Sequence, residues 1–255
     1  MFNQINYQWR VTKYNPKYRN EFGHYTLIEE WTCPSEIGET INGKEFTLDE
    51  YLRVEAAYIH SVLNFMEESN VDSLRILQLE CNRLEEEKIS PLYEKEFEKL
   101  VLKEDAVLNK DEIHLICKMV LRNIIWCNLY SKEFFVHFGW DYYMFIGSIV
   151  NCVTASKFAT NNGLFVERYT SPYFIAEDET IREIQWSEIG NELIMGEEEL
   201  RNIPLNAYRQ IFGLSESHPV IGSFKIKKEQ VEFFQRFLKH KMDFEKYEYY
   251  FWGSN

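Results

Sequence analysis

Acid–base chemistry is the first function that the residue types suggest. His137 and Asp141 stand four positions apart, in a segment that the apolar pattern predicts to be a β-hairpin. An imidazole and a carboxylate at one hairpin tip can transfer protons. If Glu167 converged on the same place, the three would form the dispersed site of a hydrolase or nuclease. The alternative is a His137 hydrogen-bonded in an aromatic core, with Asp141 as a turn residue.

Other catalytic motifs in the chain are incomplete. Residues 38–44 match G-x-x-x-x-G-K, but Glu45 stands where a phosphate-binding loop needs a magnesium-binding Ser or Thr. His114 and Cys117 have the spacing of a metal pair on one helix face, whereas a structural zinc site needs four ligands. Residues 86–88 read E-x-K, as in metal-dependent nucleases, within a charged run typical of a solvated helix. The sequence therefore predicts no metal and no cofactor.

The charge balance points instead to a basic partner. The chain has 28 Lys and Arg against 41 Asp and Glu, a net charge of −13. This acidity argues against nucleic-acid binding, which needs cations to replace phosphate counterions. Acidic runs beside aromatic residues suit recognition of a basic protein. The predicted partner-binding residues are Glu177, Asp178, Glu179, Trp186, Glu197, Glu198, Glu199, Trp140, Asp141 and Tyr142.

Composition also restricts the class of protein. With 255 residues, 45% of them hydrophobic and 16% aromatic, the chain is too apolar to be disordered. Five cysteines without paired spacing argue against a disulfide framework and favour a reducing compartment. The first residues show no signal peptide, and no apolar run reaches the roughly 20 residues of a membrane span. We therefore expect a cytoplasmic protein without membrane contact.

The hydrophobic pattern predicts an α+β fold in which helices cover a mixed or antiparallel sheet. The predicted hairpin has aromatic residues on both faces, so we place it at the centre of the sheet. Residues 176–222 are expected to be irregular, with a short helix near 197–202. The predicted strands are 9–14, 73–80, 134–138, 142–146, 164–169 and 247–252, and the predicted long helices are 47–68, 113–130 and 227–241.

The best-defined element of this pattern is the helix over 47–68. Thr47 and Glu50 form a capping box at its start. Apolar side chains recur at three- to four-residue spacing and predict the face that is buried. They are Leu48, Leu52, Ala56, Ile59, Leu63 and Met66.

A weak internal repeat suggests two domains. Residues 11–16 resemble residues 166–172, and a tryptophan followed by Ser-Glu-Ile-Gly stands 20 positions after the first valine of each copy, as Trp31 and Trp186. We interpret this repeat as one strand–loop–helix–strand unit used twice. The predicted domains are 1–155, which contains the central hairpin, and a smaller, similar domain over 156–255 that packs against it.

An acidic, aromatic-rich chain without a catalytic motif resembles, in general character, the bacterial immunity proteins that neutralise polymorphic toxins. The resemblance implies stoichiometric binding of a basic toxin or nuclease domain, with carboxylates that mimic phosphates. It assigns no individual residue. A homodimeric structural or regulatory protein, with exposed aromatic residues at its interface, is the alternative outside catalysis.

Overall fold

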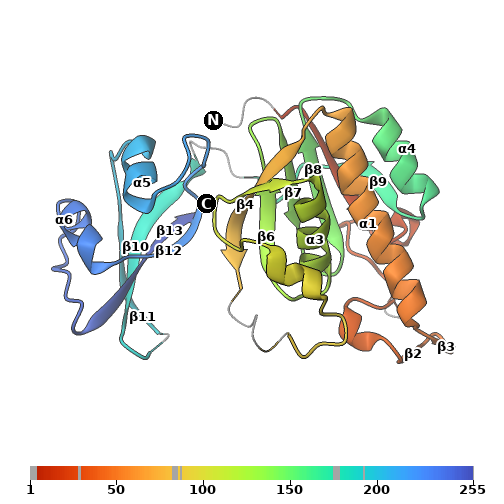
Figure 1. Ribbon diagram of the computed structural model, residues 1–255, viewed down its shortest axis with the longest axis horizontal. Helices are drawn as coiled ribbons and strands as arrows, with labels where there is room; N and C mark the ends of the chain where they lie inside the picture. Colours follow the sequence, from red (N-terminus) through yellow and green to blue (C-terminus); the bar gives the residue numbers. More distant parts are fainter. Residues whose placement is uncertain are drawn as a thin grey trace. The chain divides into compact units, whose positions relative to one another are not determined.

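The chain folds into two compact α+β units. The computed structural model describes residues 5–27, 30–81, 86, 88–174, 179–191 and 193–254 (Figure 1). One unit comprises residues 2–173, and the other comprises the chain from Phe174 onward. Every strand pairing among the described residues is antiparallel, which confirms the predicted fold class.

The first unit is built on a seven-stranded sheet with the order β5-β4-β6-β7-β8-β1-β9. The predicted hairpin is β7–β8, and β7 is the central strand. A separate short hairpin, β2–β3, precedes the first long helix. The strands are β1 (Tyr7–Thr12), β2 (Thr40–Ile41), β3 (Lys44–Glu45), β4 (Ser73–Glu80), β5 (Val107–Asn109), β6 (Trp126–Tyr130), β7 (Phe134–Phe138), β8 (Tyr143–Ser148) and β9 (Phe165–Arg168).

Three α-helices of this unit, α1, α3 and α4, share one hydrophobic core with the sheet (Figure 1). Short 3-10 helices, η1, η2 and η3, occur in the connecting segments. No helix in the described part of the chain is long and apolar enough to cross a bilayer. The bounds are α1 (Leu48–Glu68), α3 (Lys110–Leu121), α4 (Val153–Asn161), η1 (Pro16–Tyr18), η2 (Pro34–Glu36) and η3 (Lys95–Lys99).

Helix α1 begins where the sequence predicts, because the Thr47 hydroxyl accepts the Glu50 amide at 3.2 Å. The buried face differs in part from the prediction. Ile59 and Met66 are buried, but Leu48 and Leu52 are exposed. Tyr51 and Tyr58 occupy the core instead, because their hydroxyls donate to the carbonyl oxygens of Leu121 and Tyr142. A buried tyrosine is stable where its hydroxyl finds such an acceptor.

The predicted helix over 113–130 is only half correct. Helix α3 ends at Leu121, Asn123 adopts a left-handed φ of 58°, and strand β6 begins at Trp126. A continuous apolar run does not distinguish a buried helix from a buried strand. The left-handed asparagine is the local signal that ends the helix.

The second unit is a four-stranded sheet with the order β11-β10-β13-β12. Helices α5 and α6 pack on one face, where Phe212 of α5 lies 5.1 Å from Phe251 of β13 and 5.7 Å from Phe234 of α6, measured between ring centroids. The elements are β10 (Ile181–Glu188), β11 (Ile194–Glu199), α5 (Leu205–Phe212), β12 (Gly222–Lys225), η5 (Lys228–Gln230), α6 (Val231–Phe234) and β13 (Tyr247–Ser254).

Two predictions for the second unit are wrong. The region 176–222, expected to be irregular with a helix near 197–202, contains the β10–β11 hairpin. The helix expected over 227–241 is reduced to η5 and the single turn of α6. Glutamate has low strand propensity, so residues 197–199 did not look like part of a sheet before their pairing with β10 was known.

The unit boundary lies at residues 173–174, not at 155–156. Helix α4 spans the predicted boundary, and β9 pairs with β1 of the first unit. The first unit therefore includes β9, the last of its strands in chain order, and ends after it.

The predicted duplication is also wrong. The two matching strand segments lie side by side in one sheet, with Val11 and Val166 as register partners. Trp31 lies in an irregular segment, whereas Trp186 lies within β10 of the second unit. What the copies share is a turn that ends on a glycine with positive φ, Gly38 at 95° and Gly190 at 79°.

Candidate functional site

The β7–β8 hairpin tip holds an exposed tryptophan on a strained turn. Asp141 and Tyr142 have φ values of 53° and 60°, and the Tyr143 amide donates to the Trp140 carbonyl at 3.1 Å. This is the geometry of a two-residue type I′ loop, which glycine and asparagine normally provide. Strained backbone of this kind persists only where surrounding contacts hold it.

The three residues predicted at this tip have different environments. Trp140 is 85% exposed, and Asp141 is exposed. Tyr142 is buried, because its hydroxyl donates to the Leu121 carbonyl at 2.8 Å and its ring packs edge-on against Trp31. Tyr142 is therefore the anchor that holds the strained turn, and its prediction as a partner-binding residue is wrong.

His137 is a core residue. Its ring stacks on Phe135, and its Nδ1 forms a hydrogen bond with the Ser171 hydroxyl at 2.8 Å. Burial lowers the pKa of His137 to about 3, so the imidazole is neutral at physiological pH.

Glu167 is occupied by two arginines. Partial burial would raise the pKa of Glu167, but hydrogen bonds and positive charge from Arg19 and Arg10 outweigh burial and lower it. Strands β8 and β1 lie between His137 on β7 and Glu167 on β9, which separates them by roughly 14 Å at about 4.8 Å per strand. Asp141 lies on the hairpin loop. The three residues do not converge, so the dispersed acid–base site is not formed.

Two of the other incomplete motifs have structural explanations, and residue 87 of the E-x-K run lies outside the described residues. Residues 38–44 form the β2–β3 hairpin, whose turn residues Asn42 and Gly43 have positive φ. Cys117 is buried, which raises its pKa to about 12, and all five cysteines are free thiols. Among the described residues, no group of three or more His, Cys, Asp or Glu side chains could hold a metal ion.

Two of the residues predicted in the second unit point toward its covered face. The Glu198 carboxylate accepts the amides of Lys239 and His240 at 2.8 and 2.7 Å. Trp186 stacks on the His240 ring, with ring centroids 4.2 Å apart, and lies over Gly196. Both side chains are partly buried and make contacts within the unit, and their role in partner binding stays a prediction.

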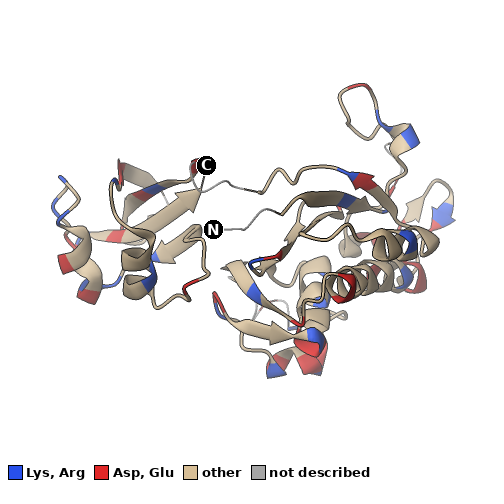
Figure 2. Ribbon diagram, turned by 90° about the horizontal axis from the view of Figure 1, so that it is seen from above, with Lys and Arg blue, Asp and Glu red and all other residues tan. Residues whose placement is uncertain are grey.

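Glu197 and Glu199 lie on the opposite, uncovered face of the sheet. Glu199 is the direct cross-strand partner of Glu183, and Glu197 is the partner of Gln185. Glu179 is exposed, and the predicted residues Glu177 and Asp178 lie outside the described residues. The uncovered face therefore collects acidic side chains from neighbouring strands. Figure 2 colours the acidic positions of the chain red along the ribbon.

Strand β13 adds aromatic residues to this face. Trp252 is paired with Glu183 and is 41% exposed, and Tyr250 is paired with Gln185. The Tyr250 hydroxyl donates to Glu248, which also binds Lys225 at 2.8 Å. We call the set Glu183, Glu197, Glu199, Glu248, Tyr250 and Trp252 the open acidic face.

Sequence reasoning missed four members of the open acidic face, Glu183, Glu248, Tyr250 and Trp252. A partial signal was present, because polar and apolar residues alternate along 183–187 with the period of a half-exposed strand, whereas 247–252 is aromatic at five of its six positions. The pairing between these strands brings the members of the open acidic face together, and neither segment alone predicts that pairing.

Comparison with known proteins bears on the second unit. Residues 181–252 match the model of a family described as a domain of unknown function, DUF7683. The matched segment begins with β10 and ends within β13, so it contains all four strands of the sheet that carries the open acidic face. No curated protein matches the chain.

Proposed function

We propose that the protein is an interaction module that binds a basic segment of a partner protein on the open acidic face. One observation carries the proposal: Glu183, Glu197 and Glu199 share an uncovered sheet face with Trp252, and two of these carboxylates are in direct cross-strand register.

Electrostatics supports this assignment. Like charges directly opposite each other on neighbouring strands destabilise a sheet, by up to about 1 kcal/mol. Glu183 accepts a hydrogen bond from Gln185, and Glu199 pairs with the exposed Arg201, so neither carboxylate is buried in a strong ion pair. A partner's lysine or arginine would relieve the repulsion, and the net charge of −13 would accelerate encounter.

The aromatic residues add apolar contact area, which charged groups alone do not provide. Trp252 and Tyr250 offer large apolar area with few rotatable bonds, and such rings are enriched at protein interfaces. Trp252 lies next to Glu183 across the strands, so a single basic side chain could contact both the ring and the carboxylate. A basic segment that also carries apolar residues is the expected ligand.

A charge-matched pair of variants tests the proposal. We expect E183Q/E197Q/E199Q to bind a labelled oligolysine peptide about tenfold more weakly than the parent chain, because three surface contacts of up to about 1 kcal/mol are lost. The control E216Q/E229Q/E232Q removes the same charge from the loop after α5, from η5 and from α6. It should bind within about twofold of the parent.

Binding to the parent chain should weaken as salt rises, because exposed charges are screened. Fluorescence anisotropy measures both effects, and circular dichroism confirms that each variant is folded. Equal losses in the two triple variants would mean that net charge alone attracts the peptide, and the proposal would then be abandoned.

The finer form of the proposal makes the partner a basic toxin or nuclease domain, inhibited as an immunity protein would inhibit it. Carboxylates on the open acidic face would occupy phosphate-binding positions of such a domain. A basic nuclease encoded beside this gene should lose activity at a one-to-one ratio with the parent chain. The same nuclease should keep its activity beside E183Q/E197Q/E199Q. Full inhibition by that variant would contradict this form.

A further inference from the structure

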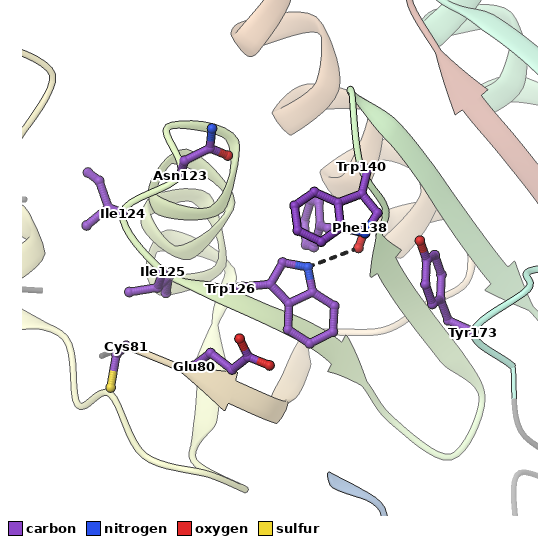
Figure 3. Close-up of a pocket in the computed structure, with 9 residues that line it drawn as sticks. All are labelled: Glu80, Cys81, Asn123, Ile124, Ile125, Trp126, Phe138, Trp140 and Tyr173. Carbon is purple, nitrogen blue, oxygen red and sulfur yellow. Dashed lines mark hydrogen bonds between the residues drawn. The ribbon is translucent and has the colours of Figure 1, made fainter. Parts of the chain in front are cut away.

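A cavity of about 590 Å³ lies within the first unit, at the end of the sheet that carries the β7–β8 tip. It belongs to the size range of small-molecule sites. Aromatic and aliphatic side chains make most of its wall, including Ile125, Trp126, Phe138 and Trp140, and Tyr173 flanks them (Figure 3). Glu80 contributes a carboxylate to the wall.

The fold holds the rings of Trp126 and Tyr173 in place at this cavity. Trp126 is the first residue of strand β6, and its indole Nε1 donates to the Phe138 carbonyl at 3.3 Å. Tyr173 is held edge-on against His137 and Phe145, with ring centroids at 6.3 and 5.8 Å. The turn fixes the backbone of Trp140, whose ring is 85% exposed. Trp126 and Tyr173 are thus positioned before any ligand arrives, which lowers the cost of binding.

The carboxylate is placed by strand pairing. Glu80 at the end of β4 is the direct cross-strand partner of Trp126, and Figure 3 shows its carboxylate beside the Trp126 indole. Glu80 is exposed, and no cation of the described residues pairs with it. A second cavity of about 360 Å³ shares Asn123, Trp126, Phe138 and Trp140, so the apolar wall continues past the indole of Trp140.

The same chain shows what such a set of side chains binds. The Lys13 ammonium lies 4.1 Å from the ring centroids of both Tyr14 and Trp31, and 3.3 Å from a Glu30 carboxylate oxygen. Two rings and one carboxylate thus surround a cation that the chain itself supplies. In the described part of the chain, no lysine or arginine lies over Trp126, Trp140 or Tyr173.

We propose that this cavity binds an organic cation, with an alkylated ammonium group held against the Trp126 and Trp140 faces beside Glu80. Ring faces attract cations, and the carboxylate adds opposite charge. An anion would be repelled by Glu80, and a neutral ligand would lack the attraction between opposite charges. The inference does not depend on the function proposed for the open acidic face, which lies in the other unit.

The test uses the whole chain and two probes of the same shape. Choline carries the charge, and its uncharged carbon isostere, dimethylbutanol, does not. We expect millimolar choline to shift tryptophan fluorescence and two indole N–H resonances saturably. The isostere should bind about tenfold more weakly.

Variants locate the response. Because Trp140 and Glu80 are exposed, W140A and E80Q should fold normally, and each should lower choline affinity about fivefold to tenfold. The control F22A removes an aromatic side chain that is 76% exposed and lies outside both proposed sites, and it should leave choline binding unchanged. Equal affinity for the two probes, or unchanged binding by W140A and E80Q, would overturn the proposal.

A second pair of probes distinguishes the sources of the ammonium group. Nα-acetyl-lysine amide and its Nζ-trimethyl derivative present the cation as a peptide side chain. Tighter binding of either than of choline would assign the cavity to a side chain of a polypeptide. Tighter binding of choline would assign it to a free small molecule.

Discussion

The two sheets of this protein differ in what their second face carries. In the seven-stranded sheet, Val136 faces the helices, and its neighbours Phe135 and His137 on the opposite face are also buried. In the four-stranded sheet, Ile184 and Phe251 are buried, whereas their neighbours Glu183 and Trp252 face solvent. A sheet buried on both faces reads as a continuous apolar run, and a half-exposed sheet alternates.

Because of this difference, the two sheets suit different functions. Inside the first unit the buried Arg122 is paired with Glu55, and a cavity lies at the β7–β8 end of the sheet. On the open acidic face of the second unit, charges stay in contact with solvent, where they cost little and are available to the proposed partner. Substitutions that change charge, protonation or side-chain volume in each unit test whether the two sheets differ in this way.

The largest effect is expected at the buried ion pair of the first unit. Arg122 donates to both carboxylate oxygens of Glu55 at 2.7 and 2.8 Å, and both side chains are almost fully buried. R122M would leave Glu55 as an unpaired buried charge, at a cost of about 3–5 kcal/mol in the free energy of unfolding. Urea denaturation followed by fluorescence measures it.

Two controls accompany this substitution. K225M removes the partner of Glu248 on the open acidic face and should cost less than about 1 kcal/mol. The double variant E55L/R122M should recover most of the loss, because it leaves no unpaired charge. A small effect of R122M, comparable with that of K225M, would contradict the contrast between the units.

The next effect depends on pH. Since burial lowers the pKa of His137 from 6.5 to about 3, only the unfolded chain binds this proton between those values. The first unit should therefore lose up to about 1.4 kcal/mol of stability per pH unit as the pH falls below 6.5. Above that pH the contribution is constant.

H137Q isolates this contribution from the carboxylates, which also titrate in acid. Urea denaturation at about pH 7 and about pH 4.5 should give a smaller acid loss for H137Q than for the parent chain. Parallel losses in the two proteins would show that His137 is accessible to protons in the folded state.

A smaller effect is expected at a pair that occurs in both sheets, a glycine covered by an aromatic ring on the neighbouring strand. Gly147 is paired with Phe135, and Gly196 is paired with Trp186, and in each case the ring covers the glycine. G147A would push against a fully buried ring and should cost about 1–3 kcal/mol. G196A should cost less, because Trp186 is only half-buried and can shift.

Thermal unfolding of the two alanine variants provides the measurement. Neither glycine has a positive φ, so backbone strain does not confuse the comparison. If G196A were the more harmful variant, the second unit would be packed more tightly than its exposed face implies.

Several features were determined by local sequence. The Thr47 cap, strand 73–80 and the central hairpin all lie where the sequence predicts them. Each depends on residues a few positions apart, which sequence displays directly. The acidic composition, which motivates the proposed function, is equally independent of the fold.

The directions in which the functional side chains point depend on the tertiary structure. Among three consecutive glutamates, pairing with β10 places Glu198 on the covered face and its two neighbours on the open one. Tyr142 is buried although Trp140, two residues earlier, is exposed, because the Leu121 carbonyl meets its hydroxyl. Register and long-range hydrogen bonds join residues far apart in sequence, so no local pattern could have fixed them.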